Sequence, residues 1–75
     1  MATSISLGKR MAAWRAHRGL TVNEVSQRAG VTSRMISYVE RGEHSMTVSK
    51  LERVVTKGLR ATLVEFFGPL PERAA

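Results

Sequence analysis

Apolar residues recur along the chain at spacings of three and four, which is the spacing of one face of an α-helix. The pattern is interrupted by glycines that can end a helix and by threonines that can cap one. It predicts helices over residues 6–18, 21–29, 32–41, 47–57 and 62–67. We therefore expect a small all-α domain of five helices.

The second and third of these helices have the clearest boundaries. Thr21 and Glu24 form the Thr-x-x-Glu pattern of a capping box, which satisfies two backbone donors of the first turn. Gly30 can take the positive φ that ends a helix, and Thr32 can cap the helix that follows. The stretch from residue 21 to residue 42 therefore predicts a helix-turn-helix.

The second helix of this motif has two chemically different faces. At about 100° per residue, its apolar side chains fall on the side of Ile36. The opposite side offers two guanidiniums, a hydroxyl and a phenol, and no carboxylate: Arg34, Ser37, Tyr38 and Arg41. Such groups suit hydrogen bonds to phosphates and base edges. We interpret this helix as one that reads the major groove of double-stranded DNA.

The run GVTSRMISYVERG, residues 30–42, closely resembles the helix-turn-helix signature of the Cro/C1-type (XRE) family of transcription regulators. The resemblance extends from about Leu7 to Phe67 and implies a compact, lambda-repressor-like fold. Relatives pair an arginine of the first helix with a glutamate near the end of the third, which here are Arg15 and Glu40. Helical angles place both at the edge of buried faces, so we expect a structural ion pair.

Two sets of residues are candidates for contacts with DNA. The base contacts are expected from Ser33, Arg34, Ser37 and Tyr38, and relatives often use the first, second and fourth of these positions. The phosphate contacts are expected from Asn23, Arg41, Ser45, Thr47 and Lys50. Many relatives carry glutamine where this chain has Val22, so one phosphate contact of the relatives is missing unless Asn23 supplies it.

Lys50 lies in the first turn of the fourth predicted helix, where a cation is unfavourable unless an anion binds there. The buried stripe of that helix is expected to contain Val48, Leu51, Val54 and Val55. Its last turn, around residues 56–59, is one residue longer than the common spacing in the family.

The net charge of +6 is unevenly distributed. Residues 1–42 hold seven Lys or Arg against two Glu, whereas residues 43–75 hold five against four. The excess of positive charge therefore coincides with the helix-turn-helix, as contact with a polyanion requires.

Residues that could carry out catalysis are scarce. Aspartate and cysteine are absent, and the two histidines, His17 and His44, fall in separate elements without metal-ligand spacing. The glycines are dispersed, so no phosphate-binding glycine-rich loop is present. We expect neither an enzyme nor a cofactor. The apolar runs are too short to span a bilayer, so we expect a cytoplasmic protein without a membrane partner.

The last predicted helix carries more apolar residues than one face of so short a helix can bury: Leu63, Val64, Phe66 and Phe67. We expect some of them to form a homodimer contact. We divide the chain into an N-terminal arm (1–5), the DNA-binding domain (6–68) and a C-terminal tail (69–75). The expected function is a homodimeric repressor acting on an inverted-repeat operator. An antitoxin with a toxin partner and a restriction–modification controller remain open, because both use the same fold.

Overall fold

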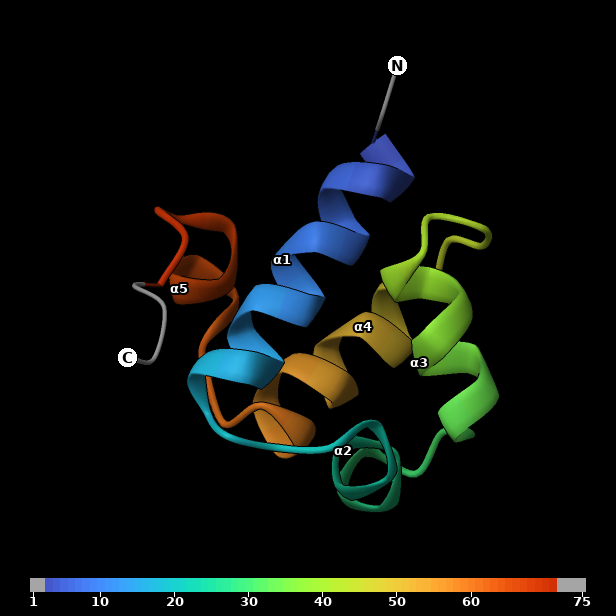
Figure 1. Ribbon diagram of the computed structural model, residues 1–75. Helices are drawn as coiled ribbons and strands as arrows, with labels where there is room; N and C mark the ends of the chain where they lie inside the picture. The colour runs from blue at the N-terminus through green and yellow to red at the C-terminus, as the bar shows by residue number, and fades with distance from the viewer. Residues whose placement is uncertain (1–2, 72–75) are drawn as a thin grey trace.

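The computed structural model describes residues 3–71, and this part of the chain is entirely helical apart from its connecting segments (Figure 1). Its elements are α1 (Thr3–His17), α2 (Val22–Ala29), α3 (Ser33–Glu40), α4 (Val48–Arg53), the π-helical turn η1 (Val54–Gly58) and α5 (Leu63–Phe67). The predicted all-α, five-helix class is confirmed, with η1 continuing α4. Residues 1–2 of the predicted arm and residues 72–75 of the predicted tail lie outside the described residues.

The helix α1 runs diagonally across the domain and separates α3 from α5 (Figure 1). It begins at Thr3, so residues 3–5 continue the helix that we expected to begin at residue 6. Every helix contributes to one hydrophobic core, which consists of Met11, Trp14, Val25, Ala29, Ile36, Val39, Leu51, Val54, Val55, Leu59, Ala61 and Phe66. Burial of these side chains is the main favourable term in the stability of so small a domain.

The predicted helix boundaries of the helix-turn-helix are confirmed by their caps. The Thr21 hydroxyl accepts a hydrogen bond from the Glu24 N–H at 3.1 Å, and the Glu24 carboxylate accepts one from the Thr21 N–H at 2.8 Å. Gly30 ends α2 in the left-handed conformation with φ of 73°. The Thr32 hydroxyl then accepts from the N–H of Met35 at 3.1 Å and so caps α3.

One expected core residue is exposed. Val48 retains 78% of its accessible surface, although the sequence pattern placed it in the buried stripe of the fourth helix. It is the first residue of α4, and its side chain points away from the core. Met46, in the preceding loop, packs against the core. The apolar stripe of this helix therefore begins at Leu51.

The end of the fourth predicted helix, around positions 56–59, lies in the π-helical turn η1 and in Leu59 after it. In a π-helical turn the backbone hydrogen bonds span five residues instead of four. Gly58, its last residue, is buried, and a Cβ atom there would lie 2.8 Å from Cγ1 of Val25. Glycine at this position lets η1 approach α2 closely.

A second close approach joins α1 to α3. A Cβ atom on Gly8 would lie 2.7 Å from the backbone oxygen of Glu40 and still closer to that of Val39. The sequence predicted no role for Gly8, because a single glycine inside a helix has no local pattern that reveals its neighbour. The crossing fixes the C-terminal end of α3 against α1.

Candidate nucleic-acid interface

The apolar and the polar side chains of α3 lie on opposite faces of the helix, as the sequence predicted. Ile36 and Val39 are fully buried on the inner face. Residues at positions i, i+1, i+4 and i+5 of a helix share one side, and the four candidates for base contact have this spacing. On the outer side Arg34 is exposed, while Ser33, Ser37 and Tyr38 are partly exposed. The structure therefore brings the four candidates together on one surface.

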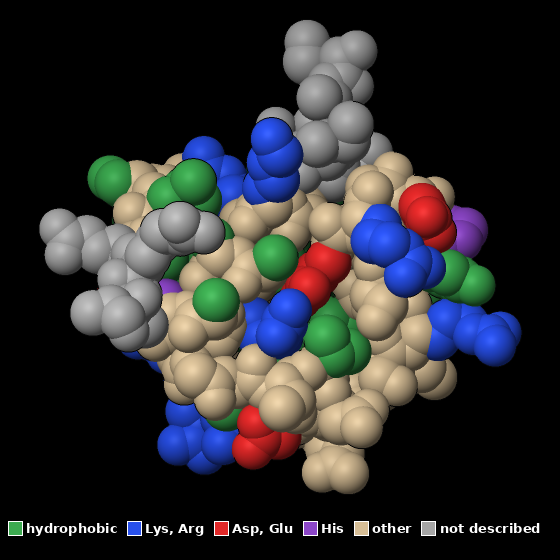
Figure 2. Space-filling view, in the orientation of Figure 1, with side chains coloured by type: hydrophobic (Ala, Val, Ile, Leu, Met, Phe, Trp, Pro, Cys, Tyr) green, Lys and Arg blue, Asp and Glu red, His purple; other side chains and the backbone are tan. Residues whose placement is uncertain are grey.

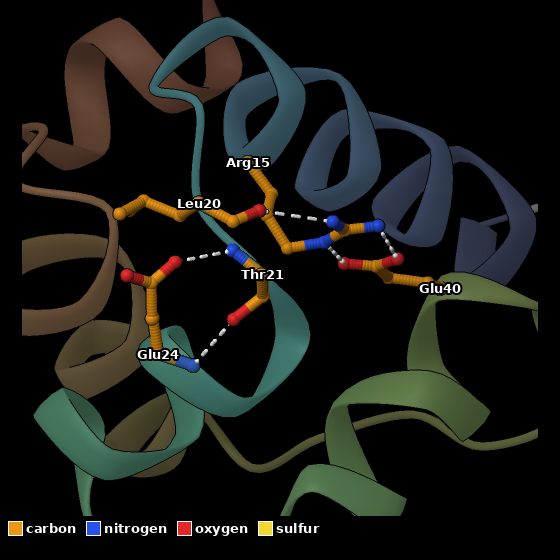
Figure 3. Close-up of polar contacts among 5 residues, drawn as sticks. All are labelled: Arg15, Leu20, Thr21, Glu24 and Glu40. Carbon is orange, nitrogen blue, oxygen red and sulfur yellow. Dashed lines mark hydrogen bonds and ion pairs between the residues drawn. The ribbon is translucent and has the colours of Figure 1, made fainter.

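The predicted ion pair between α1 and α3 is present and has bidentate geometry (Figure 3). Arg15 donates from Nε to Oε2 of Glu40 at 2.8 Å and from Nη2 to Oε1 at 2.9 Å. A third hydrogen bond runs from Nη1 to the backbone oxygen of Leu20 at 3.1 Å. Hydrogen bonding to Glu40 raises the pKa of Arg15, so the guanidinium stays charged. Arg15 therefore holds two parts of the helix-turn-helix against α1: Leu20, just before α2, and Glu40, at the end of α3.

The C-terminal end of the outer face forms a small cluster. The rings of Tyr38 and His44 lie 5.0 Å apart between centroids, and the Arg41 guanidinium lies 5.2 Å from the centre of the Tyr38 ring. Arg41 also pairs with Glu43 at 3.2 Å. The sequence predicted that Tyr38 and Arg41 share a face, but it did not predict the contacts of His44 and Glu43, because both lie in the loop after α3. Both side chains of the Arg41–Glu43 pair are more than half exposed, so the pair contributes little and can open to a phosphate.

The candidates for phosphate contact lie on exposed or half-exposed positions. Ser45 and Thr47 are exposed in the α3–α4 connection, and Asn23 is exposed in the first turn of α2. The Thr47 hydroxyl accepts from the N–H of Lys50 at 3.2 Å, which leaves its own O–H group to donate. Lys50 is half-buried in α4.

A groove of about 460 Å³ lies between the turn of the helix-turn-helix and α4. Its six lining residues include two cations and no carboxylate: Gly30, Val31, Thr32, Met35, Lys50 and Arg53. Lys and Arg side chains are also spread over the face of the molecule shown in Figure 2, including the side formed by α3. The surroundings of the recognition helix therefore favour an anionic ligand.

One of the four candidates for the dimer contact requires a correction. Phe66 is fully buried and belongs to the core, so it cannot form a surface contact. Arg10 of α1 holds the end of α5 against α1, because its guanidinium donates to the backbone oxygens of Phe66 at 3.2 Å and Gly68 at 2.6 Å. Leu63 is half-buried and packs against the core.

Two of the three exposed side chains of α5 are apolar, and the third is that of Glu65. Val64 is 84% exposed and Phe67 is 52% exposed, and Leu70 adds a third exposed apolar side chain that the sequence analysis did not include. We call these three residues the α5 patch. The sequence pattern identified the surplus of apolar residues but could not tell which phenylalanine faces solvent.

Among residues 3–71, no group of three or more His, Cys, Asp or Glu side chains is placed to hold a metal ion. None of the helices in the described part of the chain combines the length and the hydropathy that crossing a membrane requires.

Comparisons with known proteins agree with this geometry. A model of the helix-turn-helix domain family matches residues 6–65. The clp gene regulator ClgR from Corynebacterium glutamicum is 25% identical, with a TM-score of 0.78 over 84% of this chain and 66% of that one. The restriction-modification controller protein C.Esp1396I is 25% identical, with a TM-score of 0.79 over 85% of this chain and 82% of that one. No curated protein sequence matches the chain.

An HTH_3 family transcriptional regulator from Vibrio cholerae is 31% identical, with a TM-score of 0.79 over 85% of this chain. The present chain spans 35% of the length of that protein and 66% of the length of ClgR. The family model, in contrast, covers most of the chain. The chain therefore belongs to the helix-turn-helix domain family, and its structure is similar to that of transcription regulators with this domain.

Proposed function

We propose that the chain is a sequence-specific repressor that binds an inverted-repeat operator in double-stranded DNA as a homodimer. The observation that carries the proposal is the outer face of α3. Its hydrogen-bonding side chains stand on a helix whose opposite face is locked into the core by Ile36 and Val39. A rigid helix of this kind can enter the major groove without a loss of side-chain packing.

Each candidate residue has a role that follows from its chemistry. Arg34 can donate two hydrogen bonds to O6 and N7 of guanine, and Ser33, Ser37 and Tyr38 can donate to or accept from neighbouring base edges. The phosphate contacts would come from the second set, which is Asn23, Arg41, Ser45, Thr47 and Lys50. These contacts fix the register of α3 on the duplex but carry no sequence information.

Selection of bound duplexes from a random DNA pool tests the proposal. We expect enrichment of an inverted repeat whose half-sites lie about 10 base pairs apart, the spacing of successive major grooves on one side of the duplex. A pool that shows no enrichment after several rounds would refute sequence-specific binding.

Two observations support the homodimer. One recognition helix reads too few base pairs to select a site in a genome. The exposed apolar residues of the α5 patch offer a contact surface for a second copy. We expect Phe67→Ser to give a folded protein that sediments as a monomer at concentrations where the wild type is a dimer. Val48→Ser is the matched control, because it removes an apolar side chain outside the patch that is even more exposed, at 78% against 52% for Phe67. Monomeric wild type bound to a single half-site with full affinity would refute the dimer.

A second candidate function is control of restriction–modification genes. It is supported by the similarity to C.Esp1396I, of whose length this chain covers 82%. The genes that follow copies of the selected operator separate the two functions. Operator copies in front of restriction–modification genes support a controller, whereas copies in front of other genes alone contradict it.

A further inference from the structure

The groove between the turn of the helix-turn-helix and α4 combines two kinds of surface. Its volume of about 460 Å³ lies within the range of small-molecule binding sites. Val31 and Met35 supply apolar surface, and both are partly buried and pack against the core. Lys50 and Arg53 of α4 supply two cations, and none of the lining side chains is a carboxylate. We call this groove the turn groove.

The Lys50 side chain has no protein partner, although the residue is half-buried. Three of the lysines and arginines in residues 3–71 are partly buried, and they are Arg10, Arg15 and Lys50. Arg10 and Arg15 donate hydrogen bonds to backbone oxygens and to the Glu40 carboxylate. Lys50 makes no side-chain hydrogen bond or ion pair with any described residue. A partly buried charge without a partner favours the binding of an anion from solution.

Two further donors of the turn groove are available to a ligand. The Arg53 guanidinium also lacks a hydrogen bond or ion pair within the described part of the chain. It lies beside the turn, because a Cβ atom on Gly30 would lie 3.9 Å from its Nη1 atom. The Thr32 hydroxyl accepts a hydrogen bond from the N–H of Met35 at 3.1 Å, which leaves its own O–H group to donate. The turn groove therefore presents an ammonium, a guanidinium and a hydroxyl beside apolar side chains.

We propose that the turn groove binds a phosphate monoester with a small apolar body, and that this ligand competes with DNA for Lys50. A phosphate monoester carries a charge of about −1.5 to −2 at pH 7 and three acceptor oxygens, which matches two cations and a hydroxyl. Its apolar body contacts Val31 and Met35. The competition rests on the proposed function, in which Lys50 contacts a DNA phosphate. The ligand is then an inducer, because it lowers the affinity for the operator.

Titration of isotope-labelled protein with phenyl phosphate, in the absence of DNA, tests the site by NMR. We expect saturable shifts of the amide signals of Gly30, Thr32 and Lys50. Phenyl phosphate should bind at least about fivefold more tightly than inorganic phosphate, because the ring adds apolar contact equivalent to about 1 kcal/mol. Phenol, which has the ring without the charge, should leave these signals in place. An affinity for phenyl phosphate no higher than that for inorganic phosphate or for phenol overturns the proposal.

The variant Arg53→Gln separates the turn groove from a general attraction of anions to a basic protein. It removes one of the two cations and leaves every candidate for DNA contact unchanged. Phenyl phosphate should bind about fivefold more weakly, the ratio equivalent to about 1 kcal/mol for an exposed ion pair. Lys9→Gln is the matched control, because Lys9 is an exposed cation of α1 outside the groove. Equal affinities of the two variants contradict the site, and the comparison of ligands on wild type decides it if Arg53→Gln does not fold.

Fluorescence anisotropy with the selected operator tests the competition. At ten times its dissociation constant, phenyl phosphate should weaken operator binding by about tenfold for each protomer. Sodium chloride at the same ionic strength is the control, because affinity for DNA depends on salt. An operator affinity equal to that in the control overturns the competition. Because the NMR titration contains no DNA, its failure leaves the proposed function intact, whereas a protein without operator preference refutes the proposed function and leaves the site standing.

Discussion

Replacement of Arg15 by alanine tests the packing of α1 against the helix-turn-helix. The substitution removes two hydrogen bonds to the Glu40 carboxylate, at 2.8 Å and 2.9 Å, and one to the backbone oxygen of Leu20 at 3.1 Å. Glu40 would remain at the helix interface with a side chain only 11% exposed. Its negative charge would then lack a partner in a place where water can solvate it only in part.

The size of the loss can be bounded from this geometry. A hydrogen bond to a charged group contributes about 1.5–3 kcal/mol, whereas an ion pair fully exposed to water contributes about 0–1 kcal/mol. The Arg15 side chain is 25% exposed, so solvent screening places the pair between these limits. We expect Arg15→Ala to lower the free energy of unfolding by about 1–2 kcal/mol. For a domain of this size the melting temperature should fall by roughly 4–16 °C.

Urea denaturation and thermal melting followed by circular dichroism measure this loss. Glu43→Gln is the matched control, because it weakens the more exposed pair with Arg41, whose side chains are 56% and 53% exposed. It should cost less than about 1 kcal/mol. A denaturation midpoint for Arg15→Ala that equals the wild-type midpoint would show that water solvates the pair fully and that the docking of α1 against α3 is wrong.

Two further substitutions test other parts of the account. Gly8→Ala should destabilise the domain by about 2 kcal/mol or more, since the new Cβ would lie 2.7 Å from the Glu40 backbone oxygen. In the control Gly19→Ala the new Cβ meets no neighbouring atom, so this variant should cost only the strain of its φ of 68°. Equal midpoints for the two variants would contradict the close crossing. The hydrogen bonds from the N–H and hydroxyl of Thr21 hold the pKa of Glu24 below its ordinary value. This carboxylate therefore stabilises the fold above its unfolded pKa and loses the contribution as the pH falls through the lower folded pKa. Glu24→Gln should show a smaller loss of stability than wild type from about pH 5 to about pH 3, and an identical pH profile would refute the capping role.

The sequence predicted the features that depend on neighbours close in the chain. The predicted capping box of Thr21 and Glu24 is present in the structure, which has a second one of Thr62 and Glu65. The left-handed Gly30 lies where the first helix of the motif had to end. These predictions succeeded because a cap is formed within four residues, so the sequence alone contains the whole interaction.

Features that depend on distant partners were predicted less completely. Arg10 and Arg18 donate to backbone oxygens more than 40 positions away, and no local pattern reveals those acceptors. The choice between Phe66 and Phe67 as the exposed ring depends on how α1 covers α5, which the periodicity of a five-residue helix cannot specify. The Arg15–Glu40 pair was predicted across 25 positions only because the family resemblance supplied the partner.

The ratio of affinities for the selected operator and for a scrambled duplex tests most directly whether α3 reads sequence. It should be measured for wild type, Arg34→Ala and Lys50→Ala at several salt concentrations. Arg34→Ala should weaken operator binding by roughly 5- to 150-fold, equivalent to about 1–3 kcal/mol, and leave binding to the scrambled duplex far less affected. Lys50→Ala should weaken both duplexes alike and lower the salt slope by about one. If Arg34→Ala weakens both duplexes equally, α3 does not read the bases and the assignment of the recognition face is wrong.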